Sequence, residues 1–133
     1  MIKTSALAAW SPRVLSIFRI VTGLLFIQHG TQKIFSFPAE ARGPFDLMTQ
    51  MGIGGALELV GGALIIVGLF TRPTAFILSG MMAVAYWQFH APGEVYPLNN
   101  GGELAIMYCF AFFYFIFAGP GPWSLDALMR KRA

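Results

Sequence analysis

A single acidic residue lies inside one of the most apolar stretches of this chain. Residues 51–70 read MGIGGALELVGGALIIVGLF, and Glu58 is the only charged side chain among them. A charged side chain at the centre of a membrane-spanning helix costs about 2.5 to 3.5 kcal/mol. Glu58 therefore needs either a partner or a bound proton, and the helix that carries it must turn this side away from lipid.

The glycines of the same stretch predict which side of the helix that is. They recur at a spacing of seven, at positions 54, 61 and 68 and again at 55 and 62. This spacing returns to nearly the same side of a helix, and Glu58 lies on that side. Because small residues let two helices approach closely in a membrane, we expect Glu58 to face a neighbouring helix.

The composition excludes a soluble domain with a polar surface, since 56% of the 133 residues are hydrophobic and only 11% are charged. A helix of roughly 20 apolar residues crosses a bilayer. Four segments fit this description, at about 14–35, 53–70, 73–89 and 101–119. They predict an all-α fold, an integral membrane four-helix bundle with antiparallel neighbouring helices, in a single domain that covers residues 1–133.

The positive charges predict how the helices are oriented. The formal net charge is +3, but the cations form no basic stripe, so nucleic acid is not an expected partner. They gather near both termini and between the second and third helices, as Lys3, Arg13, Arg72, Arg130, Lys131 and Arg132. The positive-inside rule then places the N- and C-termini in the cytoplasm. The lipid bilayer is the first expected partner, and the glycine faces are also compatible with a homo-oligomer.

With this orientation, polar side chains from all four helices fall in the outer leaflet. They are His29, Gln32, Lys33, Glu58, Gln88, His90, Asn99, Asn100 and Glu103. We predict that they line one polar pocket, with Lys33 or His29 as the partner of Glu58. Simpler interpretations stay open for single residues, because charges at helix ends suit the helix dipole and Lys33 can extend toward the headgroups.

Neither a metal ion nor a covalently bound cofactor is expected. Cys109 is the only cysteine, which excludes a CxxC pair or a cysteine cluster. His29 and His90 are poorly placed to hold haem, because His90 ends its helix just before Pro92. The pocket could instead accept a quinone. With no electron carrier of its own, the chain would then need a redox-partner protein.

Several motifs together resemble the DoxX family of small four-helix bacterial membrane proteins. The resemblance is carried by Arg19 with Gly23-Leu24-Leu25-Phe26, His29-Gly30-x-x-Lys33-x-Phe35, Glu58-Leu59-x-Gly61-Gly62, Gly68-Leu69-Phe70-Thr71-Arg72, Asn99-Asn100-Gly101-Gly102-Glu103 and Gly119-Pro120-Gly121-Pro122-Trp123-Ser124-Leu125-Asp126. It implies a bacterial inner-membrane protein. Family members have been linked to the small subunit of thiosulfate:quinone oxidoreductase and to membrane complexes for oxidative-stress defence.

Three functions are compatible with these features. The first is an inner-membrane subunit of a redox-linked assembly, whose pocket holds a quinone headgroup or a small sulfur species while Glu58 and Glu103 exchange protons. The second is a non-catalytic membrane scaffold. The third is a binding protein or carrier for a small polar or amphipathic molecule. An accessory, non-catalytic role is favoured over catalysis, and an enzyme of this kind would be an oxidoreductase.

Overall fold

The computed structural model describes residues 3–133, and all regular secondary structure within that range is helical. This confirms the all-α prediction. The elements are α1 (Thr4–Phe35), α2 (Gln50–Val67), α3 (Thr71–Ala85), the π-helical turn η1 (Tyr86–His90), α4 (Pro97–Asn100), α5 (Glu103–Ala118) and α6 (Leu125–Arg132).

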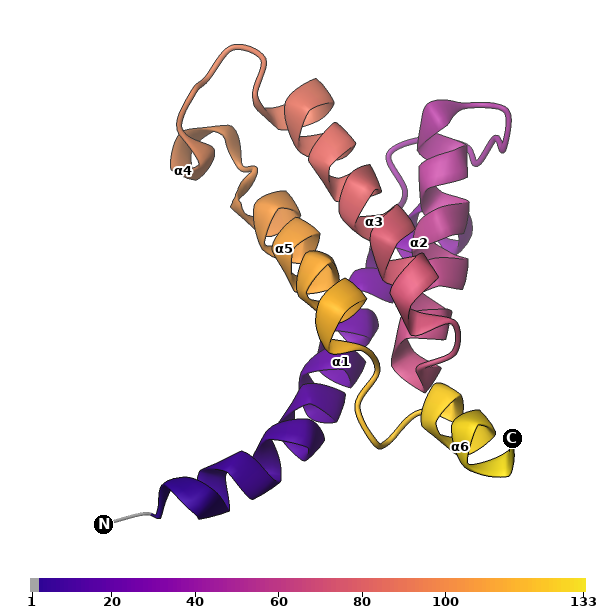
Figure 1. The fold of residues 1–133 in the computed structure, drawn as a ribbon. Helices are drawn as coiled ribbons and strands as arrows, with labels where there is room; N and C mark the ends of the chain where they lie inside the picture. Colours follow the sequence, from indigo (N-terminus) through magenta and orange to yellow (C-terminus); the bar gives the residue numbers. More distant parts are fainter. Residues whose placement is uncertain (1–2) are drawn as a thin grey trace.

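The four long helices run alternately up and down, so that each is antiparallel to the next (Figure 1). Helix α1 packs along α2, and α3 packs along α5, while shorter contacts join α2 to α3 and α1 to α5. The N-terminal part of α1 extends away from the other helices. Both chain ends lie at the lower end of the molecule, together with the turn between α2 and α3 (Figure 1).

Three helices begin earlier than their apolar segments suggest, and α2 does so by three residues, at Gln50. Helix α1 begins at Thr4 and continues through Pro12, because residues 4–10 are rich in the good helix formers Ala and Leu. Helix α3 begins at Thr71, ahead of Pro73, since the Asp126 carboxylate accepts hydrogen bonds from the N–H groups of Phe70 and Thr71. Its upper end widens into the π-helical turn η1, where the N–H group of Ala91 donates to the carbonyl of Tyr86, five residues earlier.

Glycines bring α1 and α2 into close contact. A Cβ at Gly30 would lie 2.5 Å from the backbone nitrogen of Leu59, and one at Gly62 would lie 2.8 Å from Cβ of Ile27. Gly55, one turn before Glu58, faces the Lys33 side chain. Of the predicted glycines, Gly55 and Gly62 therefore pack against α1. Gly61 instead faces the Leu78 side chain of α3, and no atom lies within 4 Å of the position that a Cβ of Gly54 would occupy.

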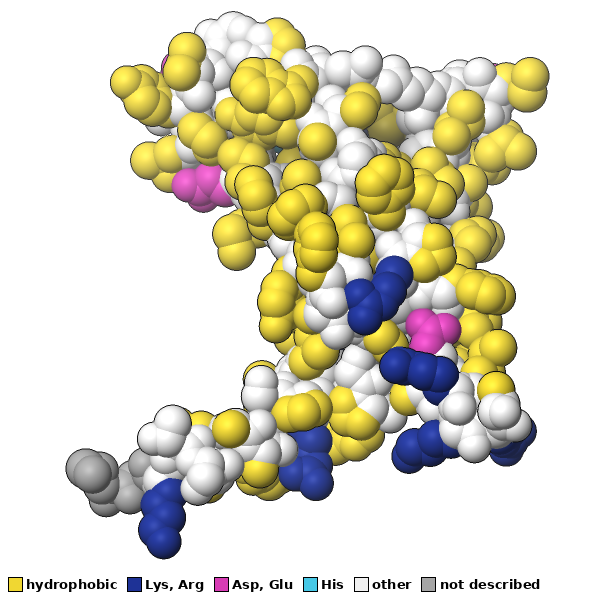
Figure 2. All heavy atoms as spheres, viewed as in Figure 1, with side chains coloured by type: hydrophobic (Ala, Val, Ile, Leu, Met, Phe, Trp, Pro, Cys, Tyr) yellow, Lys and Arg dark blue, Asp and Glu magenta, His cyan; other side chains and the backbone are white. Residues whose placement is uncertain are grey.

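The core is small and the remaining surface is apolar. Phe26, Ile65, Leu78, Phe112 and Phe115 are completely or almost completely buried. In contrast, Phe76 is 69% exposed and Met107 is 68% exposed. Figure 2 shows hydrophobic side chains over most of the visible face. Within the described residues, α1 and α2 are long and apolar enough to cross a membrane, and α5 is a shorter apolar helix.

Candidate functional site

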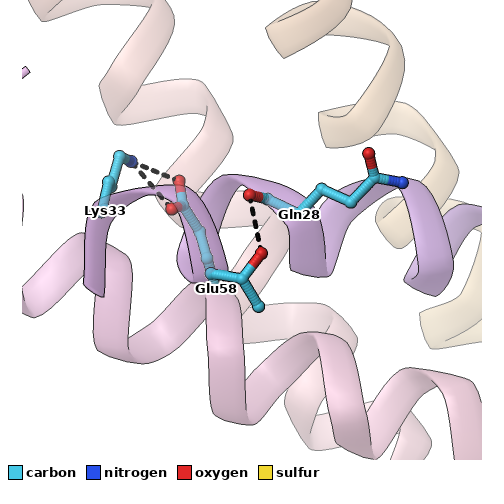
Figure 3. Close-up of polar contacts among 4 residues, drawn as sticks. Gln28, Lys33 and Glu58 are labelled. Carbon is cyan, nitrogen blue, oxygen red and sulfur yellow. Dashed lines mark hydrogen bonds and ion pairs between the residues drawn. The ribbon is translucent and has the colours of Figure 1, made fainter. Parts of the chain in front are cut away.

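An ion pair joins the upper end of α1 to the middle of α2. Lys33 Nζ lies 2.7 Å and 2.8 Å from the two carboxylate oxygens of Glu58, and the Glu58 side chain is only 7% exposed. Figure 3 shows the two side chains pointing toward each other, with the side chain of Gln28 directed away from them. Of the two predicted partners of Glu58, Lys33 forms the pair and His29 does not. The buried charge is balanced within the protein, and the glycine contacts hold the two helices close enough for this pair.

A hollow of about 320 Å³ opens beside α1, near the upper part of α5. Its lining combines apolar and polar side chains, which are Leu25, Gln28, His29, Gln32, Pro38, Ala39, Leu104 and Tyr108. The His29 ring stands almost perpendicular to the Tyr108 ring, at 5.9 Å between centroids. Neither ring nitrogen of His29 has a hydrogen-bond partner among residues 3–133. This hollow is called the α1–α5 groove below.

The other polar residues predicted for one pocket are distributed over separate contacts. Gln32 donates to the carbonyl of Glu40 at 3.2 Å, and Gln88 accepts from the side chain of Gln50. His90 Nδ1 lies 3.1 Å from the carbonyl oxygen of Asn100. The Asn100 side chain in turn contacts Tyr86, Glu94 and Gly102. Asn99 and Glu103 are exposed.

The divergence of the helices explains this separation. Figure 1 shows α4, which carries Asn99 and Asn100, and the beginning of α2 at opposite sides of the upper end. No hydrogen bond or ion pair within residues 3–133 connects the His90–Asn100 contact to Lys33 or Glu58. Of the predicted set, only His29 and Gln32 line the α1–α5 groove.

Arg19 forms a second buried charge site, which the sequence analysis did not identify. Its side chain is completely buried, with Nε donating to the carbonyl of Ile65 at 2.9 Å and Nη2 to that of Trp123 at 2.7 Å. Further bonds reach the carbonyls of Ile66 and Pro120. Since Ile65 and Ile66 belong to the last turn of α2, their carbonyls have no partner inside that helix. The signal that could have revealed this site was a cation within an apolar segment, the same reasoning that singled out Glu58.

Two further charged residues cap helices at the same lower end. Arg72 Nη1 donates to the carbonyls of Ile116 and Phe117 at the end of α5, at 2.5 and 2.7 Å. The Asp126 carboxylate caps the beginning of α3 through the N–H groups of Phe70 and Thr71, each at 2.9 Å. Partial burial acts to raise the pKa of the Asp126 carboxyl, but these hydrogen bonds and the positive charge of Arg130 together lower it below its usual value.

The described residues differ in the ligands they could hold. No group of three His, Cys, Asp or Glu side chains within residues 3–133 is arranged to hold a metal. The α1–α5 groove offers an imidazole and two amides above apolar side chains, which are groups that hydrogen-bond a polar head and enclose a hydrophobic ring.

Comparison with known proteins gives consistent results. The DoxX family model matches residues 14–91. An uncharacterized protein of Haemophilus influenzae is 42% identical, over 95% of this chain and 98% of its own length. An uncharacterized membrane protein of Mycobacterium tuberculosis is 28% identical over 92% of this chain and 84% of its own length. The inner membrane protein YqjF of Escherichia coli is 32% identical over 86% and 90% of the two chains. No solved structure matches.

Proposed function

Because this chain belongs to the DoxX family, we propose that its 133 residues form one four-helix domain in the bacterial inner membrane. The four spans in this proposal are α1, α2, α3 with η1, and α5. The exposed apolar side chains of these helices support it, since they would otherwise face water. The shared position of the two termini and their basic residues supports a cytoplasmic location for both.

We further propose that the protein is an accessory subunit of a redox-linked assembly and binds a quinone headgroup in the α1–α5 groove. The observation that carries this proposal is the free imidazole of His29 at a mixed polar and apolar hollow of about 320 Å³. Small-molecule sites occupy about 300 to 1,000 Å³ and combine apolar walls with few polar groups. His29 would hydrogen-bond a quinone oxygen, and Tyr108 and Leu104 would contact the ring.

The ion pair has a positioning role in this proposal. Lys33 already contacts both oxygens of Glu58, so neither group has its charge free for a ligand. The pair would hold the upper part of α1, and with it His29, against α2. The same observation favours the second candidate function, a non-catalytic scaffold, in which the groove stays without a specific ligand.

Binding of a short-chain quinone to the purified protein in detergent separates the two functions. We expect saturable binding of decylubiquinone, measured by equilibrium dialysis, and a loss of about tenfold in affinity for His29→Leu, which removes a hydrogen bond. His90→Leu is the matched control, because His90 contacts Asn100 and does not line the groove. If binding is not saturable, or if both variants bind as tightly as the unaltered protein, the scaffold is the better account.

A further inference from the structure

A second hollow lies at the opposite end of the molecule from the ion pair. It has a volume of about 470 Å³ and is lined by the part of α1 around Pro12, the beginning of α3, the end of α5, the loop that follows α5 and the beginning of α6. Its lining includes Ser11, Pro12, Leu15, Arg72, Tyr114 and Arg130. Figure 2 shows that most of the visible Lys and Arg side chains lie in this lower part of the molecule.

The two arginines bring positive charge to this hollow. The charge of Arg130 acts on the Asp126 carboxylate one turn earlier on α6, but the oxygens of Asp126 accept from the N–H groups of Phe70 and Thr71. Arg72 uses only Nη1 for the end of α5, and its Nη2 and Nε have no acceptor within the described chain. Arg130 has no hydrogen-bond partner among the described residues either. No carboxylate of residues 3–133 lies within 4.0 Å of either guanidinium. Two guanidinium groups beside one hollow favour an anion with several oxygens, such as a phosphate group.

The backbone around Arg72 is shaped to hold its side chain in place. Gly119 has φ +78°, and a Cβ there would lie 2.9 Å from Arg72 Nη2. Gly121 has φ +76° and lies so close to α1 that a Cβ would overlap the Ser16 hydroxyl. Because glycine adopts positive φ without steric cost and carries no Cβ, the 119–121 turn can pass beneath the guanidinium. The two carbonyl contacts then hold Arg72 with its remaining donors free.

We propose that this hollow binds the phosphate headgroup of an anionic phospholipid of the cytoplasmic leaflet. Leu15, Pro12 and Tyr114 provide apolar contact for the glycerol and the first acyl carbons, beside the two arginines. A lipid fits this combination better than a free anion because the hollow lies where apolar helices end and basic residues begin. The inference rests on the membrane location proposed above, but not on quinone binding.

The test is a titration of the purified protein in dodecyl maltoside with dioleoylphosphatidylglycerol, with lipid-bound protein counted by native mass spectrometry. Dioleoylphosphatidylcholine, which has the same acyl chains and a neutral headgroup, is the reference lipid. We expect one retained phosphatidylglycerol per protein and at least about fivefold weaker retention for Arg130→Gln, the factor for one lost cationic contact. Arg132→Gln, on the same helix but outside the hollow, should change retention less than twofold.

Several results would overturn the proposal. Equal retention of the two lipids, or equal weakening by Arg130→Gln and Arg132→Gln, would mean that no specific site exists. If millimolar inorganic phosphate displaces the bound phosphatidylglycerol as effectively as added phosphatidylglycerol does, the hollow takes a free anion. Arg130→Gln leaves the cap of α5 intact, so the test does not depend on a variant that could fail to fold. His29→Leu should retain the lipid fully, so lipid and quinone binding can fail separately.

Discussion

Glu58 and Arg19 are both buried charges, but they are stabilised by different kinds of partner. Glu58 has one counter-ion, Lys33, on a neighbouring helix. Arg19 has no carboxylate within 4.0 Å among residues 3–133 and is surrounded by four carbonyl oxygens. An ion pair can be replaced as a unit by apolar groups. Arg19 cannot be replaced in this way, because the carbonyls that it satisfies would remain.

A double-mutant cycle tests the coupling of Lys33 and Glu58. Glu58→Gln or Lys33→Met alone should destabilise the protein by about 1 to 4 kcal/mol, because each strands the partner in a site of low dielectric constant. The double variant should cost less than the sum of the single changes, since no charge is left unpaired. Thermal unfolding of the four proteins in detergent measures this. Strict additivity would show that the 2.7 Å contact contributes no coupling energy.

Replacement of Arg19 should be among the most damaging single changes on α1. Arg19→Met removes four hydrogen bonds and leaves buried carbonyls unsatisfied, which predicts a loss of at least about 3 kcal/mol. The control is Arg13→Met, two turns earlier, where the guanidinium is exposed and lies 5.0 Å from the centre of the Trp10 ring. Thermal unfolding in detergent compares the two. Similar melting temperatures for both variants would contradict the structural role assigned to Arg19.

At the scale of the helices, the effect of a glycine replacement on stability depends on what the added Cβ would meet. Gly30→Ala should push the two helices apart, because its Cβ would lie 2.5 Å from the backbone of Leu59. Gly54→Ala should be neutral or stabilising by up to about 1 kcal/mol, since it meets open space and alanine favours helix. The unfolding midpoints of the two variants, measured in the same detergent, test both expectations. If Gly54→Ala is less stable than the unaltered protein, Gly54 contacts another chain or a lipid.

The cap of α3 predicts a defined dependence of stability on pH. Because the pKa of the Asp126 carboxyl is lowered in the folded protein, its contribution to stability is complete above the ordinary Asp value of about 4. It is lost as the pH falls through the lowered pKa. Asp126→Ala should cost about 1 kcal/mol near neutral pH and weaken the loss of stability in acid. Melting temperatures across this pH range test it, with Glu40→Gln, an exposed acid, as the control.

The sequence predicted those features that follow from local chemistry. An acid within an apolar segment requires a partner, and glycines seven residues apart indicate a packing side, so Lys33, Glu58 and Gly62 were assigned to the correct interface. The prediction of a single outer pocket used only the depth of each polar residue in the membrane. Residues at the same depth can lie on helices that diverge, so this depth does not show whether they meet. The Asp126 cap joins groups 55 residues apart in the chain, and no periodic pattern encodes such a contact.

At the scale of the whole molecule, the proposed orientation can be tested by labelling with a membrane-impermeant maleimide. After Cys109 is replaced by alanine, single cysteines are introduced as Glu40→Cys, Glu94→Cys and Arg132→Cys. We expect the first two to react from outside the inner membrane and the third to react only after the membrane is opened, because the basic chain ends stay in the cytoplasm. Labelling of Arg132→Cys in intact spheroplasts would reverse the assignment of leaflets to both hollows.

The contacts of Arg19 also have a consequence for the order of events during biosynthesis. Its partners Pro120 and Trp123 follow it by 101 and 104 residues, so they leave the ribosome long after α1 has reached the membrane. At about 5 to 20 residues per second, this interval is on the order of 5 to 20 s. Until then, the guanidinium has only water, lipid headgroups or the insertion machinery to solvate it. The first helix can reach its final depth only when the loop after α5 has been made, which links the burial of Arg19 to the synthesis of residues 120–123.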